Sequence, residues 1–260
     1  MTSLVEVSNM FFHYPRARTK DGEINWTLQD ISLKIEAKST VGIVGESGSG
    51  KTTLALSLMR AYAPTSGNLF FEDQDITHLS EKALKDFRKK VQMVFQDPYG
   101  SLNPRMRIVK AIAEAIRQHQ GLDKKASRVA ALDLLESMGI SNLDAQKFPS
   151  KLSGGQRQRA SVARALSAQP SVLIADEPTS AIDQSAQAQL LGLFNDLIKK
   201  GLSIVLVSHD LGVIRYLSDY VYVMKDGIFV ESGKSEEIFN NPKEEYTKKL
   251  ISSIPGRSTK

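Results

Sequence analysis

The chain has 260 residues, of which 41% are hydrophobic, with 34 basic and 29 acidic side chains and a formal charge of +5. This composition excludes a disordered chain and predicts one large domain with a sizeable core. The absence of cysteine excludes disulfides and thiolate metal sites, and no apolar run approaches the roughly 18 residues needed to cross a bilayer.

The amino-terminal part predicts a small antiparallel β-subdomain. Residues 4–8 are expected to form a strand, and the alternating apolar residues of 28–35 predict its partner, with a polar loop at 15–26 between them. Phe11, Phe12 and Tyr14 cluster at this point. One of these rings stacks on a nucleotide base, or all of them pack in the core, and their positions alone leave both readings open.

A phosphate-binding loop is predicted after the apolar run of residues 41–44. The segment GESGSGKTT fits the pattern G-x-x-x-x-G-K-[ST]. Its glycines allow N–H groups to approach an anion at the positive end of a helix. Lys51 supplies charge to the β- and γ-phosphates, the Thr52 hydroxyl is placed to ligate magnesium, and Thr53 caps or packs. The predicted loop consists of Gly45, Glu46, Ser47, Gly48, Ser49, Gly50, Lys51, Thr52 and Thr53.

The middle of the chain predicts a helical lobe inserted into an α/β core. A strand at 68–72, a helix at 81–90 capped by Ser80, and a buried strand at 91–95 lead to Gln96. Residues 97–105 contain two prolines and a glycine, and we expect an irregular hinge there. Helices are expected at 108–119 and 124–138 from apolar residues at three- and four-residue spacing.

Two later segments carry further candidate residues. Ser153 is a plausible cap for a helix that begins with Gly154 and Gly155, which predicts either a second anion-binding helix end or an ordinary junction. A strand at 172–175 delivers Asp176 and Glu177 to its carboxyl end, where ligands of open α/β sheets gather. Asp176 fits a magnesium-orienting role and Glu177 could polarise an attacking water, with helix capping as the alternative.

The carboxyl-terminal third completes a mostly parallel sheet. A helix at 184–200 precedes a strand at 204–207, which ends at Ser208 and His209. A lone histidine is more often structural, but its place at the end of a core strand favours a γ-phosphate contact for His209. Residues 220–224 and 228–232 predict a hairpin, followed by short helices from 235. The alternation of strands and helices predicts crossover connections.

The motifs GESGSGKT, LSGGQ and LIADEPTSAID, with Gln96 and His209, together resemble the nucleotide-binding subunit of an ATP-binding cassette transporter. The resemblance implies an α/β fold with a P-loop NTPase core, an N-terminal antiparallel β-subdomain and an inserted helical subdomain. It implies ATP and Mg2+ as cofactors, a catalytic set of Glu177, His209, Gln96 and Lys51, and magnesium held near Thr52, Gln96 and Asp176. Residues that would serve the ATP of a partner subunit are Ser153, Gly154, Gly155 and Gln156, with Asp183 in the loop that communicates across the interface. Tyr14 falls where the family has its adenine-stacking aromatic and is favoured over Phe12.

Within that family, FQDPYGSLNPR and NNPKEEYTKKLISSIP resemble the oligopeptide, dipeptide and nickel importer group, and the chain is similar to the second ATPase of its pair. The implied partners are a different ATPase chain, two transmembrane pore subunits and an extracytoplasmic solute-binding protein, at the cytoplasmic face of the membrane, with no nucleic acid. The expected organisation is a core at 1–96 and 151–234, a helical subdomain at 97–150 and a tail at 235–260. A cassette ATPase acting on nucleic acid or ribosomes is the alternative.

Overall fold

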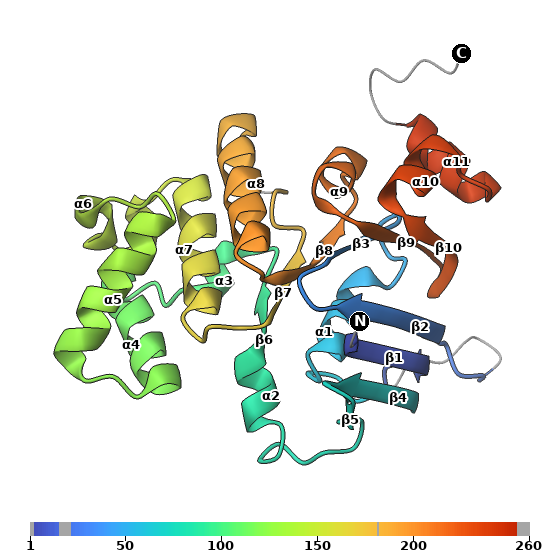
Figure 1. Cartoon of the computed structure of the whole chain (residues 1–260), viewed down its shortest axis with the longest axis horizontal. Helices are drawn as coiled ribbons and strands as arrows, with labels where there is room; N and C mark the ends of the chain where they lie inside the picture. The colour runs from blue at the N-terminus through green and yellow to red at the C-terminus, as the bar shows by residue number, and fades with distance from the viewer. Residues whose placement is uncertain (1–2, 16–21, 181, 254–260) are drawn as a thin grey trace. The chain divides into compact units, whose positions relative to one another are not determined.

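The computed structural model describes residues 3–15, 22–180 and 182–253. The chain divides into a first unit, Met1–Lys85 with Ser203–Lys260, and a second unit, Asp86–Leu202. Figure 1 labels the elements of both units. The loop expected at 15–26 and the end of the tail lie partly outside the described residues. The subdomain boundaries expected from the sequence stay a prediction.

The first unit contains strands from both ends of the chain. Its elements are β1 (Ser3–Phe12), β2 (Leu28–Glu36), β3 (Thr40–Val44), α1 (Lys51–Leu58), β4 (Ser66–Phe71), β5 (Gln74–Asp75), β8 (Ser203–Ser208), α9 (Leu211–Leu217), β9 (Tyr220–Lys225), β10 (Ile228–Lys234), α10 (Ser235–Asn240) and α11 (Glu245–Ser252). An antiparallel sheet has the order β2-β1-β4-β5, and a second set of strands has the order β10-β9-β3-β8. The expected pairing of the first two strands is confirmed, with Val5 opposite Ile35.

Burial patterns explain these strands. In β2 the buried residues Leu28, Ile31, Leu33 and Ile35 mostly alternate with exposed ones, as expected for a strand with one face in the core. All five residues of β3 are buried, which is typical of a parallel strand covered on both faces. β3 pairs in parallel with β8 and with β9. The hairpin of β9 and β10 is antiparallel, as predicted.

The second unit is mainly helical. Its elements are α2 (Lys85–Lys90), which begins at the unit boundary, β6 (Val91–Val94), α3 (Pro98–Ser101), α4 (Ile108–Gln120), α5 (Lys124–Ser137), α6 (Asn142–Ala145), a 3-10 turn (Pro149–Lys151), α7 (Gly154–Leu166), β7 (Val172–Asp176) and α8 (Gln184–Lys199). β6 and β7 pair in parallel. α4 buries Ile108, Ile112 and Ile116 on one face, so the two helices expected at 108–119 and 124–138 are confirmed.

Two local predictions were wrong. The helix expected at 81–90 begins only at Lys85, because residues 81–84 form turns in which the N–H of Ala83 donates to the Ser80 hydroxyl. The stretch 97–105, expected to be irregular, contains the helical turn α3. A proline is tolerated at the first position of a helix because its missing N–H would have no partner there.

Candidate nucleotide site

The phosphate loop lies between β3 and α1 in the first unit. Gly48 and Gly50 have φ values of 83° and 104°, which few residues other than glycine adopt. A Cβ at Gly45 would lie 2.1 Å from the carbonyl oxygen of Met224, so no side chain fits there. α1 starts at Lys51 and has no acidic residue in its first turn. Its N–H groups and positive dipole end are therefore available to an anion.

Lys51 directs its ammonium into this loop. Its Nζ donates to the carbonyl oxygens of Gly45 at 2.7 Å and Glu46 at 2.8 Å and approaches the Ser49 hydroxyl at 3.5 Å. The side chain is buried, whereas Glu46, Ser47, Gly48 and Thr52 are exposed. The Lys51 ammonium thus lies beside a loop of backbone donors, a suitable arrangement for phosphate.

Tyr14 and Phe12, in the aromatic cluster, differ in solvent exposure. Phe12 is 6% exposed and Tyr14 is 38% exposed. The Tyr14 hydroxyl lies 3.0 Å from the hydroxyl of Thr53 at the start of α1. Its ring makes edge contacts with Phe12 and Tyr62. Tyr14 is therefore held beside the phosphate-loop helix with a ring that a base can reach, which supports its sequence-based preference over Phe12.

His209 lies at the same end of the sheet as the phosphate loop. It follows β8 directly and is exposed. In the parallel pairing of β3 and β8, Val44 is opposite Ser208, so Gly45 and His209 follow neighbouring strands at equal height. In the first unit Tyr14 thus lies beside α1, and His209 follows the strand next to that of the phosphate loop. Their joint role at one nucleotide stays a prediction.

In the second unit, Gln96 and the acids Asp176 and Glu177 likewise stand at the carboxyl ends of neighbouring parallel strands. Val94 of β6 is opposite Ala175 of β7, so Gln96 and Asp176–Glu177 emerge at one sheet edge. Asp176 is buried, and Glu177 is only 9% exposed. Glu177 also has a φ of 47°, a left-handed conformation that costs a non-glycine residue about 1 to 3 kcal/mol and is typical of functional positions. The Ser180 hydroxyl donates to its carbonyl oxygen at 3.0 Å.

The LSGGQ segment forms the start of α7. The Ser153 hydroxyl accepts the N–H of Gln156 at 3.2 Å, and the Gln156 side chain accepts the N–H of Ser153 at 3.0 Å. This reciprocal cap confirms the helix start predicted at Ser153. A Cβ at Gly155 would lie 2.5 Å from that of Ala186, in the first turn of α8. Asp183 caps α8 by accepting the N–H of Ala186, so the two helix starts lie together.

Sequence reasoning missed Asp144, which holds the Gln156 side chain. Asp144 Oδ2 accepts from Gln156 Nε2 at 2.9 Å and from the Ser141 hydroxyl at 3.0 Å, while Oδ1 accepts from Lys147 Nζ at 2.6 Å. Lys147, then Ser141 and Gln156, hold the pKa of the Asp144 carboxyl below its ordinary value. Only the cap sequence S-x-x-D, Ser141 to Asp144, signalled this residue.

We expect Asp144→Ala to lower the ATPase rate of the assembled protein several-fold, because Gln156 loses the acceptor that fixes its amide. The measurement is phosphate release at saturating ATP, with binding of ATP to the isolated chain expected to be unchanged. Asp133→Ala, an exposed acid of α5, is the matched control. Equal rates for both variants would contradict this role.

The oxygen donors of the predicted magnesium set fit that ion. Thr52 offers an exposed hydroxyl, Asp176 a carboxylate and Gln96 an amide oxygen. No cluster of three acidic, histidine or cysteine side chains forms a cage among the described residues. Mg2+ is usually bound through one or two protein ligands together with substrate phosphates and water, so the donor set is of the expected kind.

Comparison with known proteins identifies the family. The model of the ABC transporter family matches residues 28–180. The oligopeptide transport ATP-binding protein OppF of Bacillus subtilis (strain 168) is 41% identical over 257 residues, covering 97% of this chain and 82% of that protein. The dipeptide transport ATP-binding protein DppF of Escherichia coli (strain K12) is 40% identical, covering 97% of this chain and 76% of that protein.

Solved structures agree with the sequence comparison. The cassette MJ0796, in a post-hydrolysis dimer bound to ADP and Pi, superposes with a TM-score of 0.80 at 29% identity over 89% of this chain and 98% of that chain. The cbiO1 protein of Clostridium perfringens, part of the transporter complex cbiONQ, gives 0.81 at 26% identity over 98% of this chain and 97% of that chain. The expected P-loop NTPase fold is confirmed, and the chain belongs to the ABC transporter family.

Proposed function

We propose that this chain is the ATP-hydrolysing subunit that energises a membrane importer of peptides or related small solutes, metal chelates such as nickel complexes included. The observation that carries the proposal is that a complete set of family motifs lies at helix starts and strand ends, in a chain about 40% identical to peptide-transport ATPases. Bound ATP draws the two ATPase subunits together, and this closure drives the pore.

The reaction is phosphoryl transfer to water, which depends mainly on positioning and on charge stabilisation. Lys51 binds the β- and γ-phosphates, and the loop N–H groups surround them. Glu177 polarises the attacking water, and His209 and Gln96 contact the γ-phosphate region. Thr52, Asp176 and Gln96 are the residues that would hold Mg2+, which would supply positive charge to offset the negative charge of the phosphates.

The proposed role in an importer implies which other subunits the chain binds. Ser153, Gly154, Gly155 and Gln156 bind the γ-phosphate of ATP carried by a second, different ATPase chain, and Asp183 communicates across that interface. Two transmembrane subunits form the pore, and an extracytoplasmic protein delivers the solute. As a subunit of such a complex the chain lies peripherally, at the cytoplasmic face of the membrane. Among the residues that the structure describes, none of the helices has the length and apolar composition of a membrane span.

Purification of the tagged chain in mild detergent tests this function. We expect integral membrane proteins and a second cassette ATPase to co-purify, and peptide with its binding protein to stimulate ATP hydrolysis. Recovery of nucleic acid or ribosomes in a salt-dependent way, without membrane proteins, would instead support the nucleic-acid alternative.

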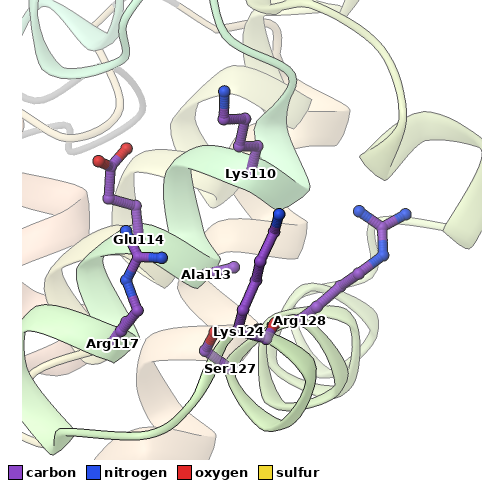
Figure 2. A pocket seen from close by; sticks show the side chains of 7 residues that line it. All are labelled: Lys110, Ala113, Glu114, Arg117, Lys124, Ser127 and Arg128. Carbon is purple, nitrogen blue, oxygen red and sulfur yellow. Dashed lines mark hydrogen bonds between the residues drawn. The ribbon is translucent and has the colours of Figure 1, made fainter.

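The helical lobe is the proposed docking site for the pore. Residues 105–128 contain seven basic and two acidic side chains, so the rest of the chain, with 27 of each sign, is neutral. Between α4 and α5 lies a hollow of about 120 Å3. Its charged lining residues, drawn in Figure 2, are four cations and one acid: Lys110, Arg117, Lys124, Arg128 and Glu114. These cations suit an acidic side chain on a short helix of a pore subunit.

We expect the double variant Lys110→Glu with Lys124→Glu to reduce assembly with the pore at least several-fold while ATP binding is retained, because the hollow then repels an acidic helix. Co-purification of the membrane subunits measures assembly. The control variant reverses the charges of two lysines outside the lobe, Lys199→Glu with Lys200→Glu at the end of α8. Parental assembly in the lobe variant would show that the pore docks elsewhere.

A further inference from the structure

The peptide between Gly45 and Glu46 is held from both sides. Its carbonyl oxygen, that of Gly45, accepts from Lys51 Nζ at 2.7 Å. Its N–H, that of Glu46, donates to the hydroxyl oxygen of Tyr246 at 3.1 Å. In a trans peptide these two groups point in opposite directions. Tyr246 of α11 and Lys51 of the phosphate loop therefore bind opposite edges of the same rigid peptide. Tyr246 lies 200 residues from Glu46 in the sequence.

Tyr246 is placed by the anchoring of the chain before α11 and by one contact of its ring. Glu231 of β10 accepts the N–H of Lys243 at 2.7 Å and that of Glu244 at 3.2 Å, which anchors the chain just before α11. Burial opposes ionisation of Glu231, but these N–H donors help to hold the pKa of its carboxyl below the ordinary value. Lys225 Nζ lies 5.2 Å from the centre of the Tyr246 ring, a cation–π distance. The hydroxyl is therefore presented to the loop at a defined place.

The Tyr246 phenol is also kept neutral. Burial raises its pKa above the ordinary value, and the carboxylates of Glu46 and Asp226 act in the same direction, although the Glu46 N–H opposes them. The phenol therefore retains its proton at physiological pH, and its oxygen accepts the Glu46 N–H as a neutral group.

The other end of the loop has its own support. The N–H of Gly227, in the turn between β9 and β10, donates to the carbonyl oxygen of Ser49 at 3.0 Å. Loss of the Tyr246 hydroxyl would therefore remove one of the hydrogen bonds that hold the Gly45–Glu46 peptide, while Ser49 stays anchored. The expected consequence is a local change in the placement of Lys51 and not a loss of the fold.

We propose that Tyr246 is a positioning residue for Lys51, and that helix α11 sets the affinity of the phosphate loop for nucleotide by fixing the Gly45–Glu46 peptide. The proposal rests on the nucleotide function proposed for the loop. If that function were wrong, the parental chain would not bind nucleotide; if this inference is wrong, only the Tyr246 variant will behave unexpectedly.

The test compares Tyr246→Phe, which removes only the hydroxyl, with the parental full chain. A neutral hydrogen bond of this kind corresponds to about a 3- to 10-fold change in equilibrium, so we expect Kd for ADP and for a non-hydrolysable ATP analogue to rise by about that factor. In the assembled transporter KM for ATP should rise similarly, with kcat near the parental value. Tyr216→Phe, on an exposed tyrosine of α9, should change neither constant.

A double-mutant cycle separates positioning of Lys51 from a general structural role. In a Lys51→Ala background, Tyr246→Phe should change nucleotide affinity by less than about 1.5-fold, because the group that it positions is gone. Equal losses in both backgrounds, or an unchanged Kd for Tyr246→Phe alone, would overturn the proposal. A lowered unfolding temperature with additive losses would assign Tyr246 a structural role only.

Discussion

A Glu177→Gln chain is expected to bind MgATP like the parental chain and to hydrolyse it roughly 10²- to 10⁴-fold more slowly, the usual contribution of a positioned general base. The amide keeps the shape of the side chain but loses the charge that orients water. Phosphate release by the assembled complex measures the rate, and equilibrium binding measures the affinity. Glu236→Gln, on an exposed glutamate of α10, is the control.

Two features of Glu177 make this variant a sharp test. The residue is nearly buried, and its backbone has a left-handed conformation directly after β7. Such strain persists only where the surrounding structure fixes it, so the glutamine should occupy the same place. Hydrolysis near the parental rate would therefore remove Glu177 from the catalytic role and could not be attributed to a displaced side chain.

The second large effect is expected from Ser153→Arg. The isolated chain should bind ATP normally, because its own phosphate loop lies in the other unit and is unchanged, yet ATP-driven closure with a partner subunit and hydrolysis in the complex should be lost. An arginine removes the cap of α7 and places a bulky cation where the γ-phosphate of the partner's ATP is expected to lie.

Sedimentation in the Glu177→Gln background, where ATP is not consumed, measures closure with the second cassette subunit directly. Ser137→Arg, at the exposed end of α5, controls for the added charge and bulk. Failure of the isolated Ser153→Arg chain to bind ATP would contradict the assignment of this serine to the partner's nucleotide, as would normal closure.

Much of the fold could be predicted because its signals are local. The phosphate loop lies between its strand and its helix in one continuous segment, residues 41–58. The buried strand that leads to Asp176 is likewise one uninterrupted apolar run. The errors were local too. Pro98 was read as a helix breaker although it opens the turn α3, and Ser80 closes a turn instead of the predicted helix.

The parts of the site that sequence could not predict depend on contacts between distant residues. Tyr246 lies 200 positions from Glu46, and no motif marks a tyrosine in α11 as a partner of the phosphate loop. Asp144 could be read as a local cap, but its bond to Gln156 requires α6 to lie beside the start of α7. The direction of Lys51, towards the carbonyl oxygens of Gly45 and Glu46, likewise depends on the loop's three-dimensional path.

The concentration of positive charge in residues 105–128 has a kinetic consequence. Charges within about 8 Å act with little screening at physiological ionic strength, and a cluster of one sign raises the rate of encounter with an oppositely charged partner by about 10- to 10³-fold. Because the remainder of the chain has no net charge, this attraction favours approach through α4 and α5. Association with an acidic partner should therefore slow steeply as salt is added, while the lifetime of the complex, set by the contacts made after encounter, changes far less.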